Sequence, residues 1–95
     1  MAAKKIVPER DAPVINCYPN PFNETLHIEI DNESYMTGNE IKILDMGGNS
    51  IRNLPLTSNQ ASWNGTNTSG TKCKPGIYLV RIGNSPTINK ILLTQ

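Results

Sequence analysis

Short runs of alternating apolar and polar residues, each closed by a glycine, proline or asparagine, restrict the fold of this chain more than any other feature. In the run 26–30 (LHIEI), three aliphatic residues alternate with His27 and Glu29. A period of two residues is the signature of a β-strand with one buried face. No stretch longer than one turn shows the i, i+3, i+4 spacing of an amphipathic helix. The sequence therefore predicts an all-β fold.

Similar runs continue to the end of the sequence. They cover residues 40–45 (EIKILD), residues 50–56 (SIRNLPL), a short stretch ending at Trp63, residues 77–82 (IYLVRI) and residues 87–95 (TINKILLTQ). The glycine-rich stretch MGGNS is expected to join the first two as a hairpin. About seven short strands at spacings of about ten residues are typical of an antiparallel β-sandwich. Trp63 and Tyr78 are predicted to anchor its core, because each buries more area than any aliphatic side chain present.

Two prolines stiffen the segment CYPNPF, residues 17–22, ahead of the first clear strand. Proline fixes its own φ and biases the preceding residue toward extended backbone, so Tyr18 and Asn20 are expected to be extended. Neither Pro19 nor Pro21 has an N–H to donate to a β-ladder, which confines the segment to a sheet edge or to a crossing between sheets. We therefore predict a rigid corner here.

Length and charge limit the classes of partner. The 95 residues form one domain, and 9 basic and 8 acidic side chains leave a net charge of +1. This balance lacks the basic surface that nucleic acids or anionic membranes bind, so neither is an expected partner. No apolar run approaches the roughly 20 residues of a membrane span, so membrane insertion is not expected, and the first residues lack the apolar core of a signal peptide.

The first dozen residues, MAAKKIVPERDA, differ in composition from the rest. They are charged and interrupted by proline, which fits a linker cut from a longer chain better than a packed element. We expect residues 1–12 to be a flexible linker that is accessible to proteases, and residues 13–95 to be the folded domain.

Residues that could perform catalysis are scarce. His27 is the only histidine, and it alternates with Leu26 and Ile28, so we expect it to be exposed on the face opposite theirs rather than to act as a base. No second histidine or glycine elbow supports a nucleophile, and the carboxylates form no recognisable acid–base pair. Neither enzymatic activity nor a cofactor is therefore expected.

The loop WNGTNTSG, residues 63–70, has the alternating oxygen-bearing side chains of a calcium loop. It contains no carboxylate, whereas calcium loops need several, so no metal is expected. Turn formation explains its asparagines and glycines better, because both residue types tolerate positive φ or close bends with their side chains.

The two cysteines, Cys17 and Cys73, match no closely spaced metal or redox motif. They are either two buried thiols or a disulfide that closes a long loop. The sequence does not place their Cα atoms, so both alternatives stay open.

Four segments, in this order, resemble the C-terminal sorting domain, type A, of the type IX (Por) secretion system: YPNPFNETLHIEI, IKILDMGGNSI, WNGTNTSGTKCKPGIYLVRI and NKILLTQ. The resemblance covers Val14 to Gln95 and rests on the ordered set, because each segment alone is common. The residues of this chain that match the family motif are Pro19, Asn20, Pro21, Phe22, Trp63, Gly65, Gly70, Gly76 and Tyr78. The chain departs from the family pattern at its two cysteines, where an aliphatic residue is usual, and at Asn89-Lys90, where a basic pair is frequent.

The resemblance implies an immunoglobulin-like sandwich that acts as a secretion signal in gram-negative bacteria of the Bacteroidetes type. Such a domain would direct an N-terminal cargo protein through the periplasm to the type IX translocon at the outer membrane. A sortase-like cysteine protease would then remove the domain, leaving the cargo on the outer-membrane surface or secreted. The Pro19–Pro21 corner would set the exit angle of the linker and keep cargo and signal apart.

The last predicted strand carries apolar residues on both faces. If residues 87–95 are extended, Ile88, Lys90 and Leu92 point to one side and the remaining apolar residues to the other. A sandwich strand needs one buried face and a buried lysine is costly, so we expect this set to be exposed. We predict that Ile88, Lys90 and Leu92 are part of what the translocon recognises. The alternative is that the linker or a neighbouring loop covers them.

A second interpretation stays open, namely a non-catalytic immunoglobulin-like accessory module of a secreted enzyme or adhesin. The sandwich pattern is also similar to that of flagellar hook-capping proteins, and fold alone does not separate these functions. A sorting signal must end its native chain at or near Gln95, whereas an accessory module can lie anywhere. A carbohydrate-binding module should also show a row of exposed aromatic residues, which this sequence does not indicate.

Overall fold

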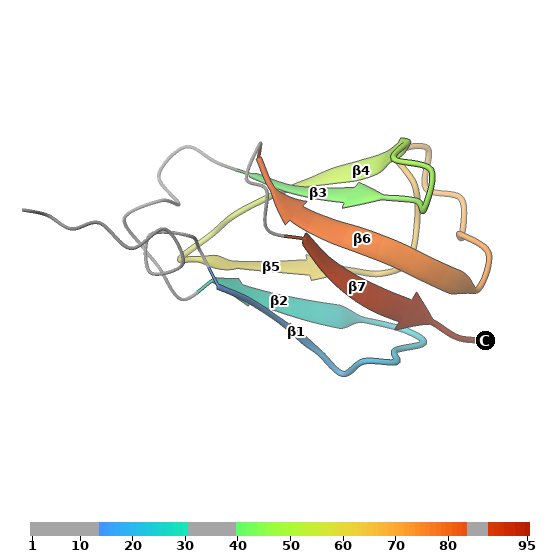
Figure 1. The fold of residues 1–95 in the computed structure, drawn as a ribbon, viewed down its shortest axis with the longest axis horizontal. Helices are drawn as coiled ribbons and strands as arrows, with labels where there is room; N and C mark the ends of the chain where they lie inside the picture. Colours follow the sequence, from blue (N-terminus) through green and yellow to red (C-terminus); the bar gives the residue numbers. More distant parts are fainter. Residues whose placement is uncertain (1–13, 31–39, 84–87) are drawn as a thin grey trace, which may run out of the picture.

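Two antiparallel sheets make up the part of the chain that the computed structural model describes, residues 14–30, 40–83 and 88–95 (Figure 1). The first sheet has three strands in the order β1 (Ile15–Tyr18), β2 (Leu26–Ile30) and β5 (Gln60–Trp63). The second has four strands in the order β4 (Ser50–Pro55), β3 (Glu40–Leu44), β6 (Gly76–Ile82) and β7 (Ile88–Leu93). All pairings within the sheets are antiparallel, which confirms the predicted all-β fold. Within the described ranges, no helix is long and apolar enough to cross a membrane.

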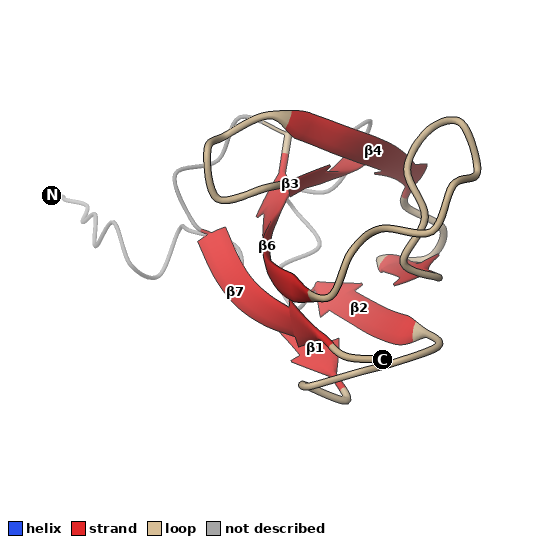
Figure 2. Cartoon of the chain, turned by 90° about the vertical axis from the view of Figure 1, so that its right-hand side faces the viewer, coloured by secondary structure: helices blue, strands red, loops and turns tan. Residues whose placement is uncertain are grey.

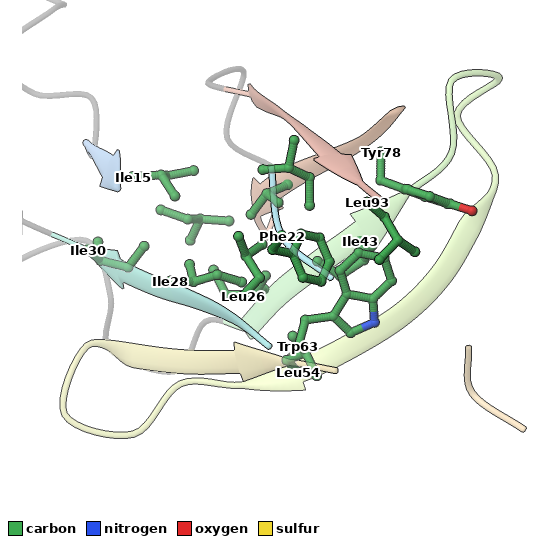
Figure 3. Close-up of a cluster of buried hydrophobic side chains, with 14 residues drawn as sticks. Ile15, Phe22, Leu26, Ile28, Ile30, Ile43, Leu54, Trp63, Tyr78 and Leu93 are labelled. Atoms are coloured by element: carbon green, nitrogen blue, oxygen red, sulfur yellow. The ribbon is translucent and has the colours of Figure 1, made fainter. Parts of the chain in front are cut away.

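The two sheets form two layers (Figure 2), and side chains from both meet in one buried cluster between them (Figure 3). Alternation along each strand places the apolar residues inward, as in β2, where Leu26 and Ile28 are fully buried. Trp63 is also fully buried and Tyr78 is 9% exposed, so both are the large core anchors that the sequence predicts. His27 lies exposed on the opposite face of β2, also as predicted.

The glycine-rich turn after β3 forms the predicted hairpin with β4, with one irregularity in the register after Ile43. Asp45 closes this turn, because its carboxylate accepts hydrogen bonds from the N–H groups of Asn49 and Gly47, both at 2.9 Å. The bonds from Asn49, with a smaller contribution from Gly47, hold the pKa of the Asp45 carboxyl below its ordinary value. The turn is therefore fixed by a local network rather than by core packing.

Turn chemistry also closes the polar loop between β5 and β6. Gly65 and Gly70 adopt positive φ values of 79° and 88°. Asn67 acts through its side chain, whose oxygen accepts hydrogen bonds from two backbone N–H groups at 2.9 and 3.0 Å. Among the described residues, positive φ outside glycine occurs at Ser58 and Asn59, in the tight turn that precedes β5. The loop therefore has the turn-forming role expected for its glycines and asparagines.

The proline segment occupies both predicted positions, a sheet edge and a crossing between sheets. β1, the edge strand of the three-stranded sheet, ends at Tyr18, immediately before the two prolines. The peptide bonds preceding Pro19 and Pro21 are cis. Beyond them the chain passes to the second sheet, where Phe22 forms a parallel bridge with Leu93. The corner therefore joins the edges of the two sheets.

Candidate recognition surface on the last strand

The last strand, β7, divides its side chains between core and solvent. Ile91 and Leu93 are 2% and 1% exposed, whereas Ile88 and Leu92 are 42% and 38% exposed. Lys90 lies between the latter two on the same outer face. The division arises because the strand belongs to a sheet with only one face on the core. β7 therefore presents Ile88, Lys90 and Leu92 to solvent.

The proline corner closes the outer edge of β7. The Asn20 side chain accepts a hydrogen bond from the Leu92 N–H at 2.9 Å and donates one to the Lys90 carbonyl at 3.2 Å. The Phe22 N–H donates to the Leu92 carbonyl at 2.9 Å, and the Phe22 carbonyl accepts from the Thr94 N–H at 2.8 Å. Unpaired groups on an edge strand would allow another chain to add to the sheet. Because these groups are paired, a partner of this part of β7 must read its side chains.

Aromatic residues of the family motif hold the end of β7 from the core side. The rings of Phe22 and Tyr78 lie 5.5 and 5.4 Å from the Trp63 ring, between ring centres. The Trp63 indole N–H donates to the Thr66 carbonyl at 2.8 Å. Figure 3 shows the Leu93 side chain beside these rings. This packing fixes the position of the strand end.

Gly65 brings the backbone of the loop between β5 and β6 against the side chain of Leu93 on β7. A Cβ at this position would lie 3.5 Å from a methyl carbon of Leu93 and 3.1 Å from Lys72 Nζ, and the positive φ disfavours any side chain. Gly70 and Gly76 also have positive φ, but a Cβ at either would meet no atom within 4 Å. Gly70 serves the backbone conformation of its turn, and Gly76 begins β6, where it lies directly opposite Leu93 of β7.

The motif residues separate into two groups in space. Around β7 lie Asn20, Phe22, Trp63, Gly65, Gly76 and Tyr78, whereas the two prolines and Gly70 shape the corner and a turn. Sequence reasoning assigned the corner to the exit angle of the linker and missed its bonds to β7. The available signal was an amide side chain held between two prolines, but its partner lies 72 residues away.

The exposed face of β7 continues onto β6. Each outward residue of β7 lies opposite an outward residue of β6, and the pairs are Leu92 with Ile77, Lys90 with Leu79, and Ile88 with Arg81. We call these six side chains the β6–β7 face. Ile77 is 45% exposed, which makes it as open to solvent as Ile88. Sequence reasoning missed the β6 half of this face because strand register depends on tertiary pairing.

An amide on the inner side of β7 joins this strand to β1. Asn89 Nδ2 donates to the Ile15 carbonyl at 2.6 Å and lies 3.9 Å from Cys17 Sγ. Cys17 and Cys73 are both free thiols, so the structure favours the unbridged alternative. Burial raises the pKa of Cys17 to about 11, against a smaller lowering by the hydrogen bond from Asn89. The contact between β1 and β7 therefore contains a thiol that stays protonated at neutral pH.

We expect the domain to lose stability in alkaline solution, in part through Cys17. Because the folded-state pKa is raised from 9.0 to about 11, this contribution is complete below pH 9 and is lost as pH rises through about 11. The Tm of a Cys17→Ala variant should fall less steeply between pH 9 and pH 11 than that of the wild type. Thermal unfolding followed by circular dichroism across this range is the measurement. Parallel plots of Tm against pH for the two proteins would show that Cys17 does not contribute to the alkaline loss of stability.

Some of the side chains considered for chemistry lie together on the outer face of β2, where the Tyr18 hydroxyl donates a hydrogen bond to Glu29 and the Tyr18 ring lies 5.5 Å from that of His27. In the ranges that the structure describes, no three His, Cys, Asp or Glu side chains gather in a way that could hold a metal ion. The face of β6 and β7 is instead a surface of aliphatic and basic side chains on a fixed strand pair. Exposed aliphatic side chains on such a surface can bind a partner.

Comparison with known proteins is consistent with this fold. A family model described as "secretion system C-terminal sorting domain" matches residues 16–94. Among solved structures, the chain is similar to PorZ of the human oral bacterium Porphyromonas gingivalis, described as an essential bacterial surface component of the type-IX secretion system. The TM-score is 0.65 at 19% sequence identity, and the match covers 85% of this chain but only 11% of PorZ. A search of curated proteins found no match.

The two packed antiparallel sheets define a small immunoglobulin-like sandwich. The chain belongs to the family of secretion system C-terminal sorting domains. It is a sorting signal for type IX secretion, as its sequence resemblance implies. Domains of this family are not catalytic, and they act in export toward the cell surface.

Proposed function

We propose that this domain carries an N-terminally attached cargo protein to the type IX translocon, which recognises Ile88, Lys90 and Leu92. The cargo would pass through the periplasm of a gram-negative bacterium and reach the outer-membrane surface or the medium. The observation that supports this proposal is the exposure of Ile88 and Leu92, 42% and 38%, on a strand fixed at both edges. Aliphatic side chains held rigidly in water are typical of a docking surface.

We further propose that a sortase-like cysteine protease separates cargo from signal within residues 1–12, with residues 13–95 remaining as the intact domain. The predicted linker lies outside the described residues, and its support is the charged, proline-interrupted sequence MAAKKIVPERDA. Folding of the domain protects the peptide bonds that follow the linker, because an ordered backbone resists proteolysis. Cleavage would therefore release the cargo without a cut inside the sandwich.

A reporter fused ahead of residues 1–95 tests the proposal in a gram-negative host with a type IX system. We expect the reporter outside the cells only when both the domain and a working translocon are present. A reporter with no domain and a host lacking the translocon are the controls. Mass spectrometry of the released domain should place its first residue within or just after the predicted linker.

Two results would contradict the proposal. Export in the translocon-deficient host would mean that another route carries the fusion. Retention of the fusion in the wild-type host, with the domain folded, would favour the accessory-module interpretation instead.

A further inference from the structure

We propose that the translocon component that reads this domain presents carboxylates set among apolar side chains, and that it binds both the β6–β7 face and Lys42 on the neighbouring strand. This inference rests on the proposed function and extends it from β7 across the sheet. It assigns recognition to a surface of three strands, β3, β6 and β7, rather than to the last strand alone. It also defines the chemistry of the partner.

The apolar half of this surface is continuous across the strand pair. Ile77 lies directly opposite Leu92, and these side chains are 45% and 38% exposed. Ile88, 42% exposed, is on the same face of the same strand as Leu92. Aliphatic side chains that are neighbours on one flat face form a patch rather than scattered exposures. A partner that covers the patch would remove all three from water at once.

The basic half of this surface is concentrated beside the patch. Lys42 on β3 lies directly opposite Arg81 on β6, and Lys90 on β7 is the diagonal neighbour of Arg81. Two cations directly opposite each other on one face of a sheet repel. Such an arrangement weakens the isolated domain unless a carboxylate lies nearby.

The described part of the chain does not supply that carboxylate. The acidic residue on β3 is Glu40, two positions before Lys42. No ion pair joins it or any other described carboxylate to Lys42, Arg81 or Lys90. Arg81 Nε is in addition buried without a hydrogen-bond partner. A buried N–H of a charged group is destabilising when it is unpaired. The three cations therefore have no paired carboxylate among the described residues, which points to carboxylates of a partner at their exposed ends; the buried Arg81 Nε itself is out of a partner's reach.

The chemistry favours an acidic protein surface over other anions. Binding to nucleic acid depends on a large basic footprint, whereas the whole chain carries a net charge of only +1. Three cations beside exposed aliphatic residues on a flat sheet face match a protein interface with an apolar centre and charged groups at its rim. Charge complementarity at such a rim provides specificity and speeds encounter.

Reversing the charge of Lys42 tests the inference by separating stability from export. In Lys42→Glu, the new carboxylate lies opposite Arg81, so the Tm of the purified domain should rise above that of the wild type. The same substitution repels an acidic partner, so export of a fused reporter should fall by about tenfold or more. Lys90→Glu should reduce export similarly. Lys74→Glu, at an exposed position outside this surface, is the matched control and should be exported normally.

The outcomes distinguish this inference from the proposed function. Normal export of Lys42→Glu and Lys90→Glu, with loss of export in Leu92→Ser, would overturn the acidic partner and leave recognition through β7 intact. Failure of the wild-type fusion to be exported would overturn the proposed function itself. Flotation of the wild-type domain with vesicles containing phosphatidylglycerol, combined with normal export of both charge reversals, would identify the surface as lipid-binding and also overturn the inference.

Discussion

Replacing Trp63 with alanine is expected to lower the free energy of unfolding by about 4–6 kcal/mol. Trp63 is fully buried, and its ring contacts Phe22 and Tyr78 at the point where the core meets β7. Removing so large a side chain destabilises a core by about 3–5 kcal/mol. The Thr66 carbonyl also loses its donor, which adds about 1 kcal/mol. A domain of this size has a total stability of about 5–14 kcal/mol, so a combined loss of about 4–6 kcal/mol removes between roughly a third and all of it.

Trp63→Phe is the matched control, because it keeps an aromatic ring but removes the hydrogen bond to Thr66. We expect it to lose about 2 kcal/mol and to remain folded. Urea unfolding of the two variants measures both losses. Equal midpoints for the alanine variant and the wild type would show that the aromatic cluster does not hold the sandwich together.

Substitutions at two adjacent positions of β7 are expected to lower different properties. Ile91→Ala should lower stability, whereas Leu92→Ser should lower export at nearly unchanged stability. Ile91→Ala removes a side chain that is 2% exposed, so it should cost about 2–5 kcal/mol and lower Tm by about 10–30 °C. Leu92→Ser changes a side chain that is 38% exposed and should shift stability by less than about 0.5 kcal/mol. If the translocon reads Leu92, the serine variant nonetheless lowers the exported fraction of a fused reporter.

Tm and the exported fraction are both measured for each variant, so that loss of recognition can be separated from loss of folding. The exported fraction of Leu92→Ser is compared with that of Thr94→Ser, a neighbouring conservative change that keeps the hydroxyl. Normal export of Leu92→Ser would remove it from the recognition surface. Loss of export together with a large drop in Tm would attribute the effect to unfolding.

The elements that could be predicted from the sequence are those whose patterns are local. Alternation in LHIEI and EIKIL indicates the inward and outward residues of β2 and β3 without knowledge of their neighbours. The strand β1, Ile15–Tyr18, is less visible because its four residues run directly into the prolines. Its extension is set by pairing with β2, which is a tertiary interaction.

The candidate surface was also predictable only in part, because half of it depends on the pairing of strands that are distant in sequence. Exposure of Ile88, Lys90 and Leu92 follows from the period of one strand and the high cost of burying a lysine. Placing Arg81 beside Lys42 requires the order β3-β6-β7, in which strands distant in sequence are neighbours. The bonds from Asn20 to Lys90 and Leu92 of β7 likewise join residues 70 and 72 positions apart. Sequence periodicity contains no information about such pairings.

The bonds between Asn20 and Leu92 also impose an order on assembly. A chain that emerges or is threaded N-terminus first presents residues 20–22 long before their partners on β7 arrive. Until then the edge of β6 that faces away from β3 is unpaired, and the core lacks Ile91 and Leu93. A product that stops short of this strand therefore cannot close the sandwich, and it exposes backbone and apolar surface that proteases and chaperones bind. Because the last strand completes the fold and also displays the candidate surface, only full-length molecules would present that surface in folded form.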